Sequence, residues 1–352
     1  MDNRFTELPL SAQTAYAQLL DAALGADLVR SVADLSGSFA AKAIKGRTYW
    51  YFQYTEPSGK LRQVYVGPDN DAVQRLMARR GEAAASTSLG PLARSAIALG
   101  CTPVLPRHLR VIRRLAEYGF FHAGGLLIGT HAFLAYGNML GLRWGGQERT
   151  QDIDFAHPGK AVSLLLPLPP GLEVRTREAI ESLSMGFLPV VGLSGKGGGT
   201  FLIPSEPEFR LDFLTPRHRG GDKPFVHPQL GITLQPLPFM EYSLEKFEQA
   251  VMLGQDGGVL VNLPSPERYV LHKLLVYGER SGTFRAKSTK DLAQAAALGS
   301  YLWEHRREAL AEALQDLLSR GKSWVARYRQ GAAALHRAYP ALEVGARLAT
   351  AV

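Results

Sequence analysis

Two aspartates separated by a single residue are the clearest candidates for chemistry in this chain. Asp152 and Asp154 flank Ile153 in a short segment with the composition of a strand. Alternate side chains of a strand point to the same face of a sheet, so both carboxylates project in one direction. A hard divalent cation, Mg²⁺ or Mn²⁺, is commonly bound by one or two carboxylates together with substrate phosphates. The pair therefore predicts a metal site that also handles a phosphorylated substrate.

A third aspartate extends this candidate site. Asp212 lies in an alternating segment, 209–214, in which Leu211 and Phe213 would point to the opposite face of the sheet. Three carboxylates on adjacent strands would hold two metal ions, and Asp212 could also take the proton of an attacking hydroxyl. Taken alone, an Asp-x-Asp triplet is also common as a solvated strand end, so the prediction depends on the complete set.

The segment upstream of the aspartate pair has the pattern of a phosphate-binding turn. An apolar run over 126–128 meets Gly129 and Thr130, and a helical stretch follows. The amides at the start of a helix point outwards and favour anions, so a phosphate group fits at this turn. Together with the aspartates, the turn indicates that the chain binds a nucleoside triphosphate (NTP).

These motifs, in this order, resemble the signature of the DNA polymerase β-like nucleotidyltransferase superfamily. In that family an apolar residue precedes Gly-Gly or Gly-Ser at the start of a helix, an Asp-x-Asp pair follows, and a further aspartate lies on a later strand. Here Thr130 stands where Ser or Gly is usual, and its hydroxyl can still donate to a phosphate oxygen. The segment 149–151 resembles the abortive-infection-type branch, some of whose members are toxins, and a group of uncharacterised bacterial nucleotidyltransferase-like proteins.

The resemblance continues towards the C-terminus and covers about half of the chain, residues 120–295. It implies that Lys273 neutralises triphosphate charge and that Asp291 orients this lysine or the nucleotide. Read without the family, Lys273 is a solvated helix lysine, and Asp291 is an acid in a first helical turn, favoured by the helix dipole. Both interpretations stay open at the level of the sequence.

Hydrophobic periodicity and the resemblance together predict an α/β (α+β) chain. The accessory module is expected to hold a helix over 1–37, a β-hairpin over 48–68 with a strand before it, and a helix over 72–80, followed by a linker over 82–91. A mixed twisted sheet flanked by helices follows as the catalytic domain, and a helical domain then covers the nucleotide. The expected boundaries of the three parts are 1–90, 91–235 and 236–352.

Aromatic and basic residues alternate in the predicted hairpin and in the segment before it. Bases can stack on such aromatic rings while the cations contact phosphates, and the pattern loosely resembles the arm-binding modules of phage-type integrases. The alternative is a half-buried hairpin whose aromatic side chains pack on the catalytic domain. The residues concerned are Lys42, Lys45, Arg47, Tyr49, Trp50, Tyr51, Phe52, Tyr54, Lys60, Arg62 and Tyr65.

Two further features resemble functional motifs. The glycine-rich stretch 192–199 lacks the spacing of a P-loop, because Gly197 follows Lys196, and it predicts a turn between two strands or a flap. His131 follows Thr130 and is either close to the phosphates or an ordinary helix residue. The histidines and the single cysteine give no zinc-binding spacing.

Composition limits the class of protein. The chain has 352 residues, of which 46% are hydrophobic and 20% charged, and a net charge of +8, which weakly favours polyanionic partners. No apolar run approaches the about 18 residues of a membrane span. The single cysteine, Cys101, excludes an internal disulfide, and the N-terminal residues lack the order of a signal peptide. A cytoplasmic location is therefore expected.

The combined features predict an enzyme that transfers a nucleoside monophosphate (NMP) from an NTP to an acceptor hydroxyl, with Mg²⁺, and releases pyrophosphate. The acceptor is expected to be RNA such as tRNA, or a protein. An aminoglycoside-type small molecule as acceptor, and a non-catalytic regulator that binds nucleotide or nucleic acid, are the alternatives. The predicted catalytic and metal-binding residues are Asp152, Asp154 and Asp212, and the predicted nucleotide-binding residues are Gly129, Thr130, Lys273 and Asp291.

Overall fold

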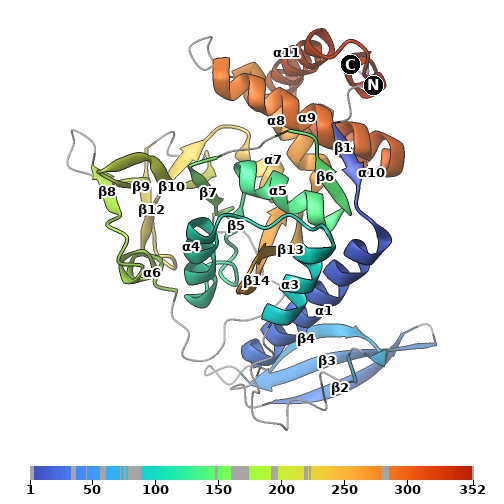
Figure 1. Ribbon diagram of the computed structural model, residues 1–352, viewed down its shortest axis with the longest axis vertical. Coiled ribbons are helices and arrows are strands. Elements are labelled where there is room, and N and C mark those ends of the chain that lie inside the picture. Colours follow the sequence, from blue (N-terminus) through green and yellow to red (C-terminus); the bar gives the residue numbers. More distant parts are fainter. Residues whose placement is uncertain are drawn as a thin grey trace.

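In the computed structural model, the segments that carry the three aspartates lie in one curled mixed sheet (Figure 1). Among the described residues this sheet has seven strands: β5 (Leu126–Leu127), β7 (Ile153–Ala156), β8 (Leu188–Val191), β9 (Gly197–Ile203), β10 (Glu206–Pro216), β11 (Phe225–His227) and β12 (Ile232–Leu237). Strands β7, β10 and β12 are parallel, whereas β5, β9 and β11 pair with them antiparallel. The predicted mixed sheet flanked by helices is confirmed.

The structure describes most of the chain. The described residues are 4–32, 37–44, 46–55, 61–71, 73–74, 77, 89–146, 150–159, 174–191, 197–217, 221, 223–279 and 285–350. Arg149, residues 82–88 of the predicted linker and residues 192–196 of the glycine-rich stretch lie outside these ranges, as does most of the helix predicted over 72–80.

Helices flank this sheet (Figure 1). They are α4 (Pro106–Glu117), α5 (Gly129–Met139) and α6 (Thr176–Ser182). Helix α4 begins at Pro106, where the missing amide hydrogen costs nothing because first-turn amides have no partner within a helix. Its apolar stripe, Leu109, Ile112 and Leu115, is buried.

The N-terminal segment is not helical throughout, so the prediction of a helix over residues 1–37 is wrong at its start. Strand β1 (Phe5–Glu7) pairs antiparallel with β6 (Leu142–Trp144), and α1 (Leu10–Val32) follows. The rings of Phe5 and Trp144 pack edge to face, with 6.5 Å between their centroids. The partner of β1 lies far away in the sequence, so no local pattern could have indicated this strand.

A largely buried hairpin that contacts β5 and the helices α1, α3 (Gly90–Leu99), α4 and α5 was not predicted. It consists of β13 (Phe247–Gly254) and β14 (Gly257–Pro264). Its side chains Val251 and Leu253 form a core with α1 and with α3, another element that the sequence did not indicate. Strands covered on both faces carry continuous apolar runs without alternation, and such runs do not distinguish strand from helix.

Three antiparallel strands form a separate N-terminal sheet, in agreement with the predicted hairpin and its preceding strand. They are β2 (Gly37–Ile44), β3 (Arg47–Thr55) and β4 (Leu61–Pro68). The Phe52 side chain is fully buried, and its ring lies 5.2 Å from that of Phe39. This sheet lies at the opposite end of the molecule from the C-terminal helices (Figure 1).

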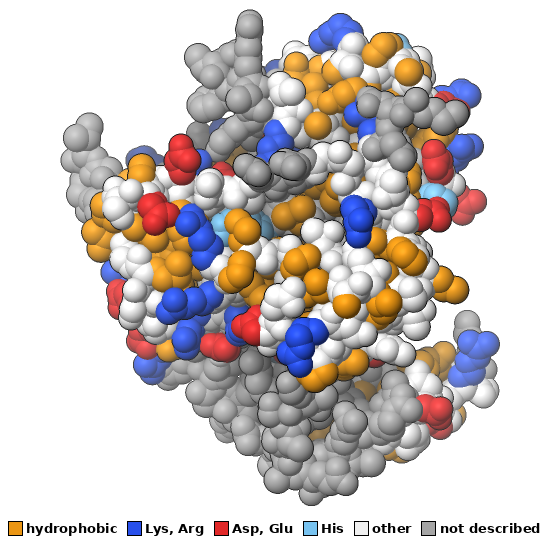
Figure 2. Space-filling model, viewed as in Figure 1, with side chains coloured by type: hydrophobic (Ala, Val, Ile, Leu, Met, Phe, Trp, Pro, Cys, Tyr) orange, Lys and Arg blue, Asp and Glu red, His pale blue; other side chains and the backbone are white. Residues whose placement is uncertain are grey.

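The C-terminal region is helical after the buried hairpin. The helices after the hairpin are α8 (Pro266–Glu279), α9 (Arg285–His305), α10 (Arg307–Ser319), α11 (Lys322–Ala338) and α12 (Glu343–Thr350), and the short helix α7 (Met240–Leu244) precedes it. One apolar core runs from α4 to α12, so the sheet and these helices support each other. None of the helices in the described ranges combines the length and the apolarity that crossing a bilayer requires. Figure 2 shows hydrophobic side chains in the middle of the face that carries α4 and α5, with Lys and Arg side chains scattered around them.

Candidate active site

The parallel pairing of β7 with β10 brings the three aspartates together. Asp154 and Asp212 are directly opposite in the register of the two strands. Oxygen atoms from Asp152, Asp154 and Asp212 all lie within 4.8 Å of one another, and the three side chains are half-buried. The alternation of β10 buries Leu211 and Phe213 on the other face and turns Asp212 towards the pair. The sequence therefore indicated which residues would meet, and the strand register explains why.

Three neighbours hold these carboxylates in place. The hydroxyl of Thr150 donates to Asp152 at 2.5 Å, and the hydroxyl of Thr200 on β9 donates to Asp212 at 2.6 Å. Arg210 lies between the two acids, with Nε 3.1 Å from Asp212 Oδ2 and Nη2 3.7 Å from Asp152 Oδ2. The sequence analysis missed Arg210, although its place two residues before Asp212 in an alternating strand puts both side chains on one face.

The turn at Gly129 fits against the aspartate strand so closely that only glycine suits it. Gly129 has φ of +62°, a conformation that side-chain-bearing residues rarely adopt. A Cβ atom at this position would lie 2.2 Å from Asp154 Oδ2. The amide of Ile128 donates to the carbonyl of Asp154 at 3.0 Å, which joins the turn to β7. The start of α5 is thereby set beside the carboxylates.

Helices α8 and α9 supply the opposite wall. Lys273 Nζ donates to Asp291 Oδ1 at 2.6 Å, and the two side chains are only 14% and 8% exposed. The interpretation of Lys273 as a solvated lysine is therefore wrong. Asp291 is not in a first helical turn either, because α9 already begins at Arg285. The hydroxyl of Tyr269 on α8 donates to the carbonyl of Gly129 at 2.9 Å and so connects this wall to the turn at the start of α5.

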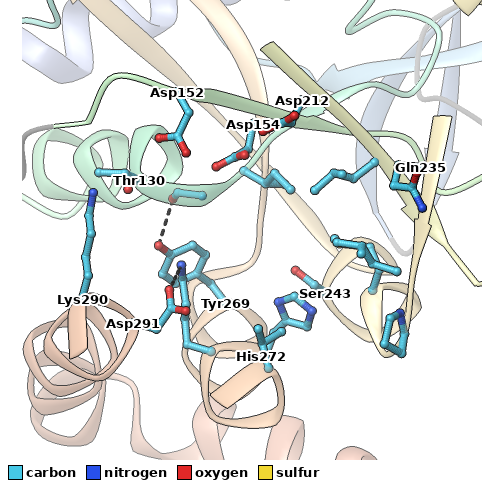
Figure 3. Close-up of a pocket in the computed structure, with 18 of the residues that line it drawn as sticks. Thr130, Asp152, Asp154, Asp212, Gln235, Ser243, Tyr269, His272, Lys290 and Asp291 are labelled. Atoms are coloured by element: carbon cyan, nitrogen blue, oxygen red, sulfur yellow. Dashed lines mark hydrogen bonds and ion pairs between the residues drawn. The ribbon is translucent and has the colours of Figure 1, made fainter. Parts of the chain in front are cut away.

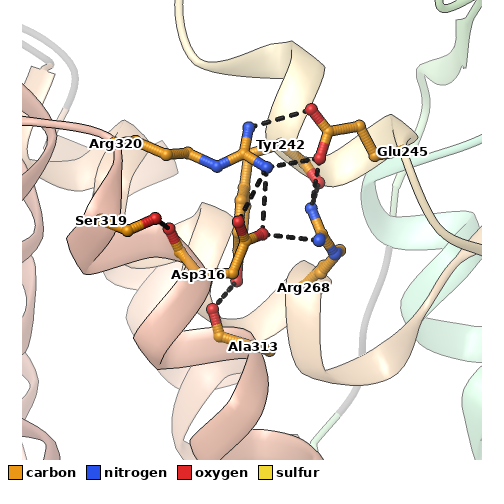
Figure 4. Close-up of polar contacts among 7 residues, drawn as sticks. All are labelled: Tyr242, Glu245, Arg268, Ala313, Asp316, Ser319 and Arg320. Carbon is orange, nitrogen blue, oxygen red and sulfur yellow. Dashed lines mark hydrogen bonds and ion pairs between the residues drawn. The ribbon is translucent and has the colours of Figure 1, made fainter.

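A network of charged side chains around the buried Arg268 fixes α8 relative to its neighbours (Figure 4). Arg268 donates to the carbonyl of Tyr242 at 2.7 Å, to Glu245 at 2.9 Å and to Asp316 at 2.6 Å. Arg320 also contacts Glu245 and Asp316, which raises its pKa further. Because the Arg268 side chain is only 6% exposed, loss of its acidic partners would leave a buried charge uncompensated, so the network ties α7, α8 and α10 into one unit.

The three aspartates, the turn at Gly129 and the facing side chains of α8 and α9 line one cavity of about 420 Å³. Figure 3 shows the three aspartates on the sheet side and Tyr269, His272 and Asp291 on the helix side of this space. Lys290, which the sequence analysis did not select, extends along one edge towards Thr130 (Figure 3). All predicted site residues line this cavity: Gly129, Thr130, Asp152, Asp154, Asp212, Lys273 and Asp291.

Two histidines form a buried pair next to this cavity. His131, directly after Thr130, has its Nε2 atom 2.9 Å from Nδ1 of His108 on α4. Burial lowers the pKa of His108 to about 4, with a further decrease caused by the charge of Arg107. Burial also lowers the pKa of His131 to about 3, and the proximity of His108 contributes. Both rings are therefore neutral at pH 7, and His131 packs inside the fold beside the turn.

Acidification is expected to destabilise the protein from about pH 6.5 down to about pH 4, where His108 itself takes up a proton. In this range the unfolded chain binds protons at both histidines and the folded chain does not. The free energy of unfolding should fall by up to about 1.4 kcal/mol per pH unit for each histidine. Urea unfolding between pH 7 and pH 4.5 measures this slope.

A double variant, His108→Phe/His131→Leu, should show a shallower dependence over the same range. The variant His305→Gln, which changes an exposed histidine, should keep the wild-type slope. Equal slopes in wild type and double variant would contradict the assignment of this pH dependence to the buried pair.

The donor set of the carboxylate cluster fits a hard divalent cation. All three side chains offer oxygen atoms, and they remain partly open to the cavity rather than enclosed by the core. Magnesium and manganese prefer oxygen ligands and share coordination with substrate phosphates. Asp152, Asp154 and Asp212 are thus the residues that would hold the metal.

The segments that form the candidate site lie within a match to a known protein family. A sequence model of the family described as Nucleotidyltransferase matches residues 107–319, more than half of the chain. Among solved structures, an antigenic nucleotidyltransferase-like protein from Paracoccidioides brasiliensis is similar, with 15% identity, a TM-score of 0.31, and coverage of 65% of this chain and 95% of that chain. No curated protein matches the chain. The family match includes every predicted site residue, and the chain belongs to this nucleotidyltransferase family.

Proposed function

We propose that this nucleotidyltransferase moves an NMP from an NTP to an acceptor hydroxyl. The observation that carries the proposal is the meeting of three carboxylates, the Gly129 turn and Lys273 in one cavity. The acceptor oxygen forms a bond to the α-phosphorus, while the bond from this phosphorus to the bridging oxygen breaks and pyrophosphate leaves. Mg²⁺ or Mn²⁺ held by the aspartates would lower the pKa of the hydroxyl and offset phosphate charge.

Each residue of the cavity has a proposed role in this reaction. Asp212 takes the proton of the attacking hydroxyl, since Thr200 and Arg210 hold its carboxylate in a fixed orientation. The amides at the start of α5, at Gly129 and Thr130, bind the terminal phosphates. Lys273 adds a positive charge from the opposite wall, and Asp291 orients it. Catalysis then rests on positioning and on electrostatic stabilisation.

Replacing Lys273 by methionine is expected to weaken NTP binding by about 10- to 100-fold, because a charge-assisted contact to phosphate contributes about 1.5–3 kcal/mol. The change also removes the Lys273 contact from the buried Asp291 carboxylate, which carries a cost in stability. The double variant Lys273→Met/Asp291→Asn removes both charges and should show the same loss of affinity. Titration with a fluorescent, non-hydrolysable NTP analogue in the presence of Mg²⁺ gives the affinity.

The variant Lys322→Met, at an exposed position on α11, serves as the matched control and should bind the analogue like wild type. If both Lys273 variants keep the wild-type affinity while folding normally, the proposed role of this lysine is wrong.

A nucleic acid such as RNA is the proposed acceptor, as in the abortive-infection-type branch that the sequence resembles. The N-terminal sheet supports this choice. Tyr51 pairs with Tyr65 across β3 and β4, Tyr49 pairs with Lys42 across β2 and β3, and these side chains share one face. The opposite face holds the buried Phe52. Aromatic rings with a lysine on an open sheet can stack bases and contact phosphates.

Incubating the protein with each α-labelled NTP, Mg²⁺, total cellular RNA and total protein tests the proposal. Label in the RNA fraction is expected, and it should be absent with the variant Asp154→Asn. Label in the protein fraction would keep the transferase reaction but replace the acceptor. Bound NTP without label in either fraction, and without a labelled small molecule, would favour the non-catalytic regulator and contradict the proposal.

A further inference from the structure

A second and larger cavity lies directly beside the candidate active site. Its volume is about 1250 Å³, compared with about 420 Å³ for the first cavity. Consecutive residues line the two cavities at two places: Thr130 lines the first and His131 the second, while Asp152 lines the first and Gln151 the second. The second cavity is bounded by α4, α5, β6 and the turn that joins β13 to β14. None of the roles proposed above uses it.

The wall of this second cavity is largely apolar and in part exposed. Leu105, for example, is 56% exposed although it is a large hydrophobic residue. Trp144 is held rigidly, because its indole N–H donates to the carbonyl of Phe133 at 2.8 Å and its ring stacks on that of Phe133 at 4.3 Å. The other apolar residues of the wall are Pro103, Val104, Pro106, Leu109, Leu134 and Leu142. Such a surface suits a flat, poorly hydrated ring.

The charges around this cavity are mainly positive. Arg110 donates to the carbonyl of Leu183 at 2.7 Å, and Arg143 donates to the carbonyl of Gly100 at 2.8 Å. Both acceptors are uncharged, so these contacts hold the two guanidinium groups in place without neutralising them. A third arginine, Arg113, pairs with Asp256, which is the only acidic side chain among the described residues that line the cavity.

We propose that this second cavity binds the 3′-terminal nucleotides of a nucleic-acid acceptor. The bases would lie on the apolar wall, and the phosphates beside Arg110 and Arg143. The terminal hydroxyl would then enter the first cavity past Gln151 and Asp152, where the two cavities adjoin. A polycationic acceptor of aminoglycoside type does not fit, because the arginines around this cavity would repel it. The inference rests on the proposed function, because it identifies where the acceptor of that reaction is held.

Binding of a single-stranded RNA oligomer with a free 3′ hydroxyl and a 5′ fluorophore tests this site. Anisotropy is measured with Mg²⁺ and without NTP, so that binding is recorded independently of transfer. The variant Arg110→Gln/Arg143→Gln should bind at least about tenfold more weakly, and the dependence of log affinity on log salt should become shallower by about 2. A circular RNA of the same sequence, which has no end, should bind wild type more weakly than the linear oligomer.

Two further variants make the result specific to the cavity. Leu134→Trp places a larger side chain at the apolar wall and reduces the space in the cavity without changing the charge. It should also weaken binding of the linear oligomer. Arg329→Gln/Arg337→Gln removes two exposed charges on α11 and should leave binding unchanged. Thermal unfolding of each variant verifies that it is folded.

The outcomes separate this inference from the proposed function. If the cavity variants bind the oligomer like wild type, or if linear and circular RNA bind equally, the inference is overturned even where label transfer to RNA is observed. If no transfer occurs but the oligomer binds through its end and depends on the cavity, the proposed function fails and the binding site stands.

Discussion

The variant Asp154→Asn is expected to lose NMP transfer by about 10³-fold or more, equivalent to about 4 kcal/mol of transition-state stabilisation. Asp154 lies opposite Asp212 on neighbouring strands and shares the carboxylate cluster with it. Asparagine preserves the shape of the side chain but removes the charge that holds a divalent cation and, through it, the phosphates. Single-turnover transfer from an α-labelled NTP measures the loss directly.

The fold should survive this substitution, because Asp154 is half-buried and asparagine retains the same volume. Thermal unfolding in the presence of a chelator should differ from wild type by no more than about 1 kcal/mol. The variant Asp21→Asn, at an exposed position on α1, is the matched control and should transfer normally. Normal transfer by Asp154→Asn would remove the carboxylate cluster from the proposed mechanism.

The variant Gly129→Ala is expected to have the second largest effect, because it combines two penalties at one atom. Alanine at φ of +62° adds strain of about 1–2 kcal/mol. The new methyl group would also lie 2.2 Å from Asp154 Oδ2, so either the turn or the carboxylate must move. We expect transfer to fall by at least about 100-fold, since displacements of about 1 Å at a reacting site have effects of this size.

A glycine in an unstrained position provides the comparison for this variant. Gly25 lies within α1, and a Cβ atom there would meet no heavy atom within 4 Å. Gly25→Ala should therefore be neutral or stabilising by up to about 1 kcal/mol, with full transfer. The expectation for Gly129 is falsified if Gly129→Ala and Gly25→Ala behave alike in transfer and in unfolding.

Part of the candidate site could be predicted because it depends on local geometry. The alternation of a strand settles that Asp152 and Asp154 face the same way, and that Asp212 faces away from Leu211. The glycine at the start of a helix is likewise a local signal. Lys273 and Asp291 were selected through the family resemblance, and the structure places them in direct contact within the same cavity. Their functions remain predictions.

The rest depends on contacts between distant segments, which no local pattern encodes. The pairing of β1 with β6 joins residues more than a hundred positions apart. Other contacts join segments that are closer in the chain but still depend on how these segments fold together. Thr200 approaches Asp212 because β9 pairs with β10, and His108 on α4 meets His131 on α5. The second cavity is formed by four separate segments and leaves no signature in any one of them.

The position of Arg210 bears on whether the protein can fold before it binds a metal ion. Three clustered carboxylates repel one another, and this repulsion would oppose folding in the absence of a cation. Arg210 contacts Asp152 and Asp212 and thereby supplies a permanent positive charge from within the chain. The polypeptide can therefore reach its native state before it meets a metal ion. Under the proposed function, folding would then be independent of metal supply, and only NMP transfer would require the ion.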